Sequence, residues 1–561
     1  MSIRNTLLLA FCMTGTMLVT TIAGANVQPP VTADNAVAEE KAVQAPIKTI
    51  SSASTDKEKK SISTADHSKF KELQQDFKTG PEVTGACLKC HTEAAKQVHK
   101  TKHWTWEYIN PATKQKLGKK NVINNFCTSV TSNQTFCSAC HVGYGWSDDN
   151  FDFTKEENVD CVVCHDTTGK YKKLPGLSGH PNYESMEWPP HSGKFREATD
   201  LTKIAQNVGK TSRKTCGGCH FYGGGGNAVK HGDLDSSLVN PKHYLDVHME
   251  TEGLNFTCAK CHLSDSHEVS GSRYAPTAVD TDGVLMRGKS DGRNPTTCQA
   301  CHGDRPHKAE HPKLNEHTDK IACQTCHIPE YARGPLATKM TWDWSTAGKL
   351  DENGHRVQVK GSDGRSTYDS KKGDFTYDRY VIPEYVWFNG DIKYTLFGDK
   401  VDGKDLVKIN EFMGTPGAPD SRIWPVKTFR GKQPYDVGNE TLAIFHTAGK
   451  DDSAFWGNYE WDKAIKWGME AAGADYSGEF KFVETEMSWP ITHMVAPKED
   501  ALSCKQCHKK DGRLEGVEGV YIPGRDANPW IDKIALLIAL LTLIGVLIHG
   551  AIRVYMNKRG E

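Results

Sequence analysis

Residues 136–165 read FCSACHVGYGWSDDNFDFTKEENVDCVVCH, and they hold two copies of a Cys-x-x-Cys-His motif that occurs eight times in this 561-residue chain. Two thiols three positions apart can bond to the vinyl groups along one edge of a porphyrin, and the adjacent histidine can then bind the iron. Eight motifs therefore predict eight covalently bound hemes c. The expected attachment residues are Cys87, Cys90, Cys137, Cys140, Cys161, Cys164, Cys216, Cys219, Cys258, Cys261, Cys298, Cys301, Cys323, Cys326, Cys504 and Cys507, and the expected proximal ligands are His91, His141, His165, His220, His262, His302, His327 and His508.

Paired cysteines also bind zinc or form disulfides, but neither alternative explains a histidine after each of the eight pairs. The motifs use all but two of the 18 cysteines, leaving Cys12 and Cys127. Cys12 lies in the apolar part of an N-terminal export signal, predicted over residues 1–25, that ends in small residues suited to cleavage. Cys127 is therefore the expected free thiol of the mature protein.

The C-terminal region contains a second apolar segment. Residues 534–552 carry no formal charge, and as a helix they would span about 28 Å, close to the thickness of a bilayer core. We expect a transmembrane anchor over residues 530–553. Because Arg553, Lys558 and Arg559 follow it, the heme region is expected on the periplasmic side of the bacterial inner membrane. His549 lies inside this span, where it could serve as a ligand or simply reach the interface.

The composition is polar for a chain of this length. Apolar residues make up 37%, the mean hydropathy is −0.58, and hemes would have to supply much of the core. Lys and Arg (69) balance Asp and Glu (70), so the charge gives no indication of a nucleic-acid partner.

The motif spacing predicts the domain organisation. We expect a disordered stalk over 26–78, a heptaheme core over 79–327, a heme-free cap over 328–503, and an eighth heme segment over 504–525. Seven closely spaced motifs favour a mainly α fold with much irregular structure, organised around stacked hemes. The cap holds eight of the 13 tryptophans and short extended runs at 377–381 and 385–388, which indicate an α+β unit.

Electron-transfer hemes usually take a second histidine, whereas a reactive heme needs an exchangeable sixth position. The chain has 24 histidines, so sixteen remain after the proximal ligands, and counting cannot choose among them. Each candidate could equally be an ordinary polar histidine. Local context favours His103, His231, His248, His267, His307, His317 and His493, with His446, His99 and His180 in reserve.

A glycine run follows the fourth motif and ends near a lysine. Residues 221–233 read FYGGGGNAVKHGD, and four consecutive glycines let backbone approach a flat surface closely. A phosphate loop is the rival interpretation, but the Gly-Lys-Ser/Thr sequence is absent. Lys230 could bind iron as a neutral amine or attract an anionic substrate as a cation; a solvated lysine is the plainer alternative.

The eight all-histidine motifs, the Asn124–Cys127 element, the Val229–Asp233 segment and the residues 491–497 together resemble the octaheme tetrathionate reductase family of periplasmic c-type cytochromes. The likeness covers residues 80 to about 525 and leaves out the stalk and the anchor. It implies that the second heme is reactive, with proximal His141, distal Lys230, and Cys127 and Asn124 nearby. The family's acidic residue is replaced here by Asn227, and Asp233 could substitute as proton donor.

The resemblance implies multi-electron reduction of a small sulfur or nitrogen oxyanion, such as tetrathionate, nitrite or hydroxylamine. The expected redox partner is an inner-membrane quinol dehydrogenase or a soluble cytochrome c. Two alternatives stay open. One is an enzyme like hydroxylamine oxidoreductase, which would need a tyrosine such as Tyr521 cross-linked to heme; the other is a non-enzymatic electron conduit.

Overall fold

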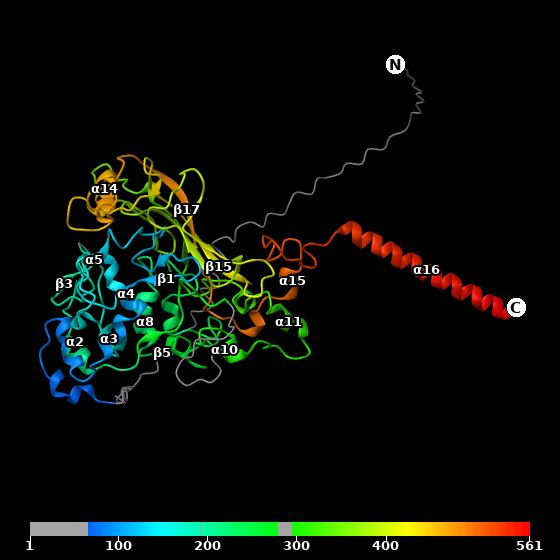
Figure 1. Ribbon diagram of the computed structural model, residues 1–561, viewed down its shortest axis with the longest axis horizontal. Coiled ribbons are helices and arrows are strands. Elements are labelled where there is room, and N and C mark those ends of the chain that lie inside the picture. Colours follow the sequence, from blue (N-terminus) through cyan, green and yellow to red (C-terminus); the bar gives the residue numbers. More distant parts are fainter. Residues whose placement is uncertain (1–64, 191, 279–293, 561) are drawn as a thin grey trace, which may run out of the picture. The chain divides into compact units, whose positions relative to one another are not determined.

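The computed structural model describes residues 65–190, 192–278 and 294–560. The expected export signal and most of the expected stalk lie outside these residues. Each Cys-x-x-Cys-His motif lies on or at the end of a short helix, which sets its two cysteines one turn apart (Figure 1). These helices are α2 (Gly80–Leu88), α5 (Gln134–Cys137) continued by η3 (Ser138–Cys140), α6 (Val162–His165), α8 (Arg213–His220), α9 (Cys258–Cys261), α10 (Gln299–His302), α12 (Cys323–His327) and α15 (Cys504–Cys507).

Short helices, turns and two-stranded hairpins connect the motif helices. The further helices are η1 (His67–Lys69), η2 (Lys71–Leu73), α3 (Ala94–His99), α4 (Lys102–Thr105), η4 (Glu156–Asn158), α7 (Leu201–Gln206), η5 (Ser236–Val239), α11 (Pro312–His317), η6 (Trp344–Thr346), α13 (Phe455–Asn458), α14 (Trp461–Ala471) and η7 (Lys498–Asp500). The hairpins are β1 (Tyr108–Ile109) with β2 (Lys116–Leu117), β3 (Met186–Glu187) with β4 (Phe195–Arg196), and β5 (Ser264–Asp265) with β6 (Glu268–Val269).

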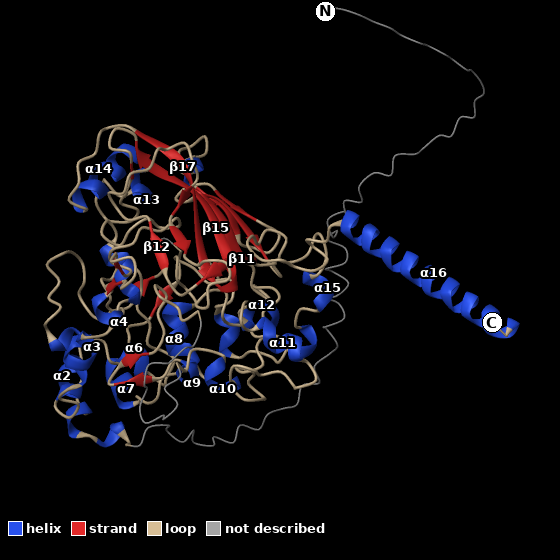
Figure 2. Ribbon diagram, turned by 45° about the vertical axis from the view of Figure 1, so that its right-hand side comes forward, coloured by secondary structure: helices blue, strands red, loops and turns tan. Residues whose placement is uncertain are grey.

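The heme-free region builds a nine-stranded sheet around two long strands (Figure 2). Its strands are β7 (Thr338–Asp343), β8 (Gln358–Lys360), β9 (Ser366–Asp369), β10 (Gly373–Asp378), β11 (Glu384–Phe388), β13 (Val407–Lys408), β15 (Arg422–Asp436), β16 (Thr441–Leu442) and β17 (Phe480–Pro490). Their order is β13-β17-β15-β7-β10-β9-β8, with β11 and β16 also paired to β15. A separate pair joins β12 (Ile392–Tyr394) to β14 (Asn410–Phe412).

Side-chain alternation explains why β17 is a strand. Val483, Thr485, Met487 and Trp489 are buried, and the residues between them are more exposed. This two-residue period fits a strand with one face against a core. β17 pairs antiparallel with β15 from Val426 to Asp436, and an aromatic core that includes Phe429 packs against it.

The expectation of a mainly α chain is not confirmed, because the largest element of tertiary structure is this sheet. The extended run expected at 385–388 lies within β11, and the run at 377–381 overlaps only the end of β10. The sheet also pairs with the motif region: Ala322 N, just before the seventh motif, donates to Ile423 O of β15 at 3.0 Å. The cap and core boundaries remain predictions.

Two terminal regions bear on the sequence expectations. Leu73 and Phe77 fall within the range assigned to the stalk, yet they are buried in a cluster with Val83 and Leu201, so ordered structure begins before residue 79. At the other end, α16 (Pro529–Arg559) contains an 18-residue window of mean hydropathy 2.5, and its residues are exposed. By length and composition α16 can cross a membrane.

Candidate functional site: paired histidines and a lysine cluster

Six motif histidines face a second histidine ring with centroids 6.0–6.5 Å apart. This spacing leaves room for a metal ion bonded at about 2 Å to a nitrogen of each ring. The pairs are His91 with His67, His220 with His103, His262 with His493, His302 with His248, His327 with His307, and His508 with His317.

Hydrogen bonds orient several of the motif histidines. His165 Nδ1 bonds to Gly209 O at 2.8 Å, His262 Nδ1 to Ser270 O at 3.0 Å, and His508 Nδ1 to Pro523 O at 3.1 Å. A metal-bound histidine characteristically donates its second ring N–H to such an acceptor. The residues present therefore fit covalent hemes with two axial histidines.

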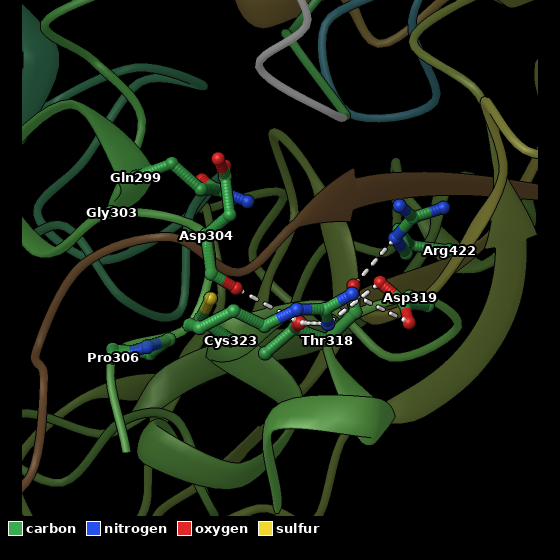
Figure 3. A pocket seen from close by; sticks show the side chains of 9 residues that line it. Gln299, Gly303, Asp304, Pro306, Thr318, Asp319, Cys323 and Arg422 are labelled. Carbon is green, nitrogen blue, oxygen red and sulfur yellow. Dashed lines mark hydrogen bonds and ion pairs between the residues drawn. The ribbon is translucent and has the colours of Figure 1, made fainter. Parts of the chain in front are cut away.

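A cavity of about 310 Å³ between two motifs gives a further indication of fit (Figure 3). Gln299 and Gly303 at the sixth motif and Cys323 of the seventh line it, together with Arg422 of β15. A concave space that opens onto an attachment thiol and includes a guanidinium suits a porphyrin with anionic propionates.

The third motif histidine, His165, has a different neighbour. Burial chiefly lowers the pKa of His267, and the imidazoles of His165 and His91 lower it further. His267 Nδ1 bonds to Gln97 Oε1 at 2.8 Å. We take His267 as the candidate distal ligand of the third heme.

Among the described residues, two motif histidines, His141 and His165, face no second histidine ring. His141 is fully buried, and the rings near it in the described part of the chain are aromatic, including Trp104, Trp106 and Trp146. Its Nε2 bonds to Trp104 O at 2.7 Å, while the buried Nδ1 has no partner among the described residues. The nitrogen left over in His141 is therefore Nδ1, whereas His165, His262 and His508 are bonded through Nδ1 and leave Nε2. The described structure places no second histidine ring opposite His141.

Cys127 lies beside this second motif. Its thiol contributes to the charge environment of Cys137, whose pKa is raised to about 12 chiefly by burial. The turn that presents Cys127 is organised by Asn124: Asn124 Oδ1 accepts from Cys127 N at 2.7 Å and Phe126 N at 3.2 Å, and Asn124 Nδ2 donates to Thr128 O at 2.7 Å. In this structure Asn124 positions the thiol by holding the turn.

The glycine run passes directly over Cys127. A Cβ at Gly225 would lie 3.9 Å from Cys127 Sγ, and one at Gly224 would lie 3.3 Å from Phe126 Cδ2. Gly224 and Gly225 have φ of +78° and +85°, a region that favours glycine. At Gly223 a Cβ would lie 3.3 Å from Lys230 Cδ, so the loop brings Lys230 and Cys127 to one place.

Buried and partly buried lysines lie around Cys127 and the glycine run. Lys230 is 5% exposed, with Nζ 5.6 Å from the Trp489 ring centroid. Lys339 of β7 is 4% exposed and lies over Trp342 and Phe375. Lys427 of β15 is fully buried and donates to Val229 O at 2.9 Å and Thr338 Oγ1 at 2.6 Å. Lys119 and Lys372 are partly buried. We call Lys119, Lys230, Lys339, Lys372 and Lys427 the lysine cluster.

The lysine cluster makes the site electropositive. Burial raises the pKa of Cys127, and the cations of Lys372, Lys339 and Lys119 oppose that rise. Burial lowers the pKa of Lys427 to about 7 and that of Lys339 well below its usual range, with the Lys372 cation adding to the effect on Lys339. Such a site attracts an anion and can release protons near neutral pH.

Two other sequence candidates lie away from Cys127. Asp233 Oδ2 is 3.2 Å from His493 Nδ1 and accepts the backbone N–H groups of Thr492 and His493. Asn227 bonds to Ser236 through both side-chain atoms. The proton-donor role considered for Asp233 gains no support from these contacts.

The sequence analysis predicted His231 as a heme ligand although it faces no motif histidine, and it did not identify several residues of the site. His231 is buried, its pKa is lowered to about 4 by burial, and its ring lies 6.1 Å from Trp489. His67, opposite His91, was missed because its segment reads as stalk. Lys339 and Lys427 carried no local signal, because distant strands bring them to the glycine run; Lys427 pairs with Trp489 in the sheet.

Neighbouring attachment sites touch through their thiols. Numbering the sites by motif, cysteine side chains lie next to one another between sites 1 and 3, 2 and 4, 4 and 5, and 6 and 7, as the pairs Cys87–Cys161, Cys140–Cys219, Cys216–Cys258 and Cys298–Cys323. The thiols of sites 3 and 4, 5 and 6, and 7 and 8 are also close enough to influence one another's pKa, through Cys164–Cys216, Cys261–Cys301 and Cys326–Cys507. The sites form one path, 1-3-4-5-6-7-8, with site 2 branching from site 4.

Comparisons with known proteins agree with this arrangement. Residues 339–511 match the family model described as "Cytochrome c bacterial". An uncharacterized protein of Archaeoglobus fulgidus is 24% identical, over 38% of this chain and 82% of the relative. The crystal structure of octaheme cytochrome c from Shewanella oneidensis is 41% identical, with a TM-score of 0.71, over 84% of this chain and 98% of that chain. The chain therefore belongs to the octaheme multiheme c-type cytochromes, the octaheme tetrathionate reductase family that its motifs resemble.

Proposed function

We propose that this protein reduces a small sulfur or nitrogen oxyanion, with tetrathionate, nitrite or hydroxylamine as the substrates to test, at the heme attached to Cys137 and Cys140. The observation that carries the proposal is the lysine cluster around Cys127 and the second motif, beside a motif histidine that faces no second histidine ring in the described structure. Buried cations favour an anion at this place over water.

Each side chain has a role in this proposal. With a heme attached at this motif, Lys230 would be the residue to hold its distal side and would give way to substrate, since a lysine amine is a weaker competitor than a fixed histidine. Lys119 and Lys372 hold the substrate's negative charge. Lys427 anchors the segment before Lys230 through its bond to Val229 O. Cys127 lies at the lysine cluster, and burial raises its pKa, which keeps it a neutral thiol.

A heme bound at this motif supplies electrons singly and an iron centre that accepts an oxyanion. Tetrathionate takes two electrons to give two thiosulfates, and nitrite takes six to give ammonia. The seven other sites connect to site 2 through site 4 and can store these electrons. Lys339 and Lys427, with lowered pKa values, can deliver the protons that nitrite reduction consumes.

We further propose that α16 anchors the protein to the inner membrane, with the heme region in the periplasm, and that a quinol dehydrogenase or a soluble cytochrome c supplies electrons. Site 8 is the motif nearest α16 in sequence, with His508 followed by Pro529 at the start of the helix. Its attachment residue Cys504 is exposed. Site 8 is thus suited to receive electrons from a membrane partner.

Lys230→Leu tests the proposed site. The variant should lose most tetrathionate and nitrite reduction and retain the optical spectrum of the other seven hemes. Lys172→Leu is the matched control, because Lys172 is an exposed lysine near the third motif. Lys173 is unsuitable, because its buried Nζ bonds to His141 O at 2.6 Å and pairs with Asp160 at 3.2 Å. Unchanged turnover in Lys230→Leu would favour the electron-conduit alternative.

A further inference from the structure

Asp233 binds the edge of His493 that faces away from the fifth motif. Asp233 Oδ2 accepts the N–H groups of Thr492 N at 2.8 Å and His493 N at 2.9 Å, and it lies 3.2 Å from His493 Nδ1, which also lies 3.1 Å from Thr492 Oγ1. The carboxylate is 1% exposed. These polar contacts keep this buried carboxylate ionised. They also fix the imidazole, whose ring centroid lies 6.2 Å from that of His262.

A carboxylate is unusual as the acceptor in these histidine pairs. His262 Nδ1, on the opposite ring, bonds to the Ser270 carbonyl. In the described part of the chain, the other paired histidines with a recorded Nδ1 bond also use neutral acceptors, such as Gly209 O for His165 and Gln97 Oε1 for His267. The fifth site therefore differs from its neighbours by one fixed negative charge on a ligand.

Other charges near Asp233 leave this bond in place. Lys427 and His231 both lie close enough to interact with the carboxylate. Lys427 Nζ, however, donates to Val229 O and Thr338 Oγ1. The bond between Asp233 and His493 is therefore retained whether or not Lys427 carries its proton.

We propose that Asp233 lowers the reduction potential of the heme attached through Cys258 and Cys261 by strengthening His493 as an axial ligand. A hydrogen bond to a carboxylate gives the imidazole more imidazolate character, which stabilises the oxidised, more positive iron. A buried charge acts strongly because little water screens it. Asp233 is thus a positioning and tuning residue.

The position of site 5 among the other sites determines what a lowered reduction potential does there. Site 5 touches site 4 through Cys258 and Cys216 and lies next to site 6 through Cys261 and Cys301. On the path described above, electrons from sites 6, 7 and 8 reach site 4 and its branch to site 2 through site 5. Because a heme with a low reduction potential stays mostly oxidised, electrons pass through site 5 without accumulating there.

Asp233→Asn tests this proposal, because it keeps the side-chain shape and removes the charge. In a spectropotentiometric titration of the eight-heme protein, one reduction potential should shift upward while the other seven stay in place. The ferric EPR signal of one low-spin heme should change with it, and Asp233→Glu should restore the potential at least in part. Asp451→Asn is the matched control, since Asp451 Oδ2 is likewise 3.2 Å from a histidine nitrogen, His446 Nε2, in a pair without a motif histidine.

A second measurement uses the unaltered protein and does not depend on how the variant folds. One low-spin ferric heme should show the near-infrared charge-transfer band of a histidine with imidazolate character, displaced from the bands of the other bis-histidine hemes. Coincident bands for all of these hemes, or an eight-heme Asp233→Asn variant with unchanged potentials, would overturn the proposal.

Discussion

Lys427 is a fully buried lysine in the middle of β15, and its burial has a measurable cost. Its pKa in the folded protein is about 7, below the value of about 10.4 for an exposed lysine. Between these two pH values the unfolded state binds more protons than the folded state. Stability should therefore rise with pH across this window and level off below pH 7.

Lys427→Met should flatten this dependence. The thermal midpoint of the native protein should gain more between pH 7 and pH 10 than that of the variant, at about 1.4 kcal/mol for each unit of pKa difference. The difference between the two proteins removes the contribution of other groups that titrate in the same pH range, because both proteins contain them. Lys172→Met, at an exposed position, should follow the native curve. Parallel curves for native protein and Lys427→Met would show that Lys427 keeps an ordinary pKa.

The sequence predicts the chemistry of the repeated motifs much further than it predicts the chemistry of the lysine cluster. The Cys-x-x-Cys-His repeats specify attachment and proximal ligands locally, and histidines near them in sequence, such as His103 and His317, were expected as partners. Lys339 and Lys427 were not expected, because a lysine in a strand ordinarily points to solvent. Only the pairing of β15 with β17 and β7 brings them to Lys230.

The glycine run is the loop that positions Lys230. Gly224→Ala should disrupt it, since φ of +78° is unfavourable for alanine and the new Cβ would lie 3.0 Å from Val229 Cγ1. We expect a loss of about 1–2 kcal/mol of stability and a larger proportional loss of oxyanion reduction, measured by thermal unfolding and turnover.

Gly457→Ala is the matched control for that loop. Gly457 lies in the short helix α13, outside the Cys-x-x-Cys-His motifs, and a Cβ there would meet nothing within 4 Å. Alanine is a better helix former than glycine, so stability should be equal or slightly higher. Equal turnover in Gly224→Ala and Gly457→Ala would mean that the loop does not hold Lys230 in a working position.

The sheet is the element that sequence reasoning described least well. Its strands are separated by long, Gly-rich and Asp-rich connections, and β15 contains Pro425, Gly431, Pro434 and several polar residues. Such a strand has a weak propensity signal, and its pairing depends on partners distant in the sequence, such as β17, from Asp436 with Phe480 to Val426 with Pro490. The alternation in β17 itself is visible in the sequence and is the signal that could have found it.

The whole chain joins an electron-carrying part to one apolar helix. Deleting residues 529–561 should release a protein that carries all eight hemes, because the last motif ends at His508. Intact mass should exceed the polypeptide mass by eight hemes, and the native protein should fractionate with membranes. A truncated protein that stays in the membrane fraction would show that another surface attaches it.

The central claim is that one of eight hemes, the second, has an exchangeable ligand supplied by Lys230. Carbon monoxide titration of the fully reduced protein, read by the Soret difference spectrum, tests it most directly. The account predicts one carbon monoxide bound per chain, with seven hemes unchanged, and a changed affinity for it in Lys230→Leu but not in Lys172→Leu. No binding at all, or binding that Lys230→Leu leaves unaltered, would contradict the account.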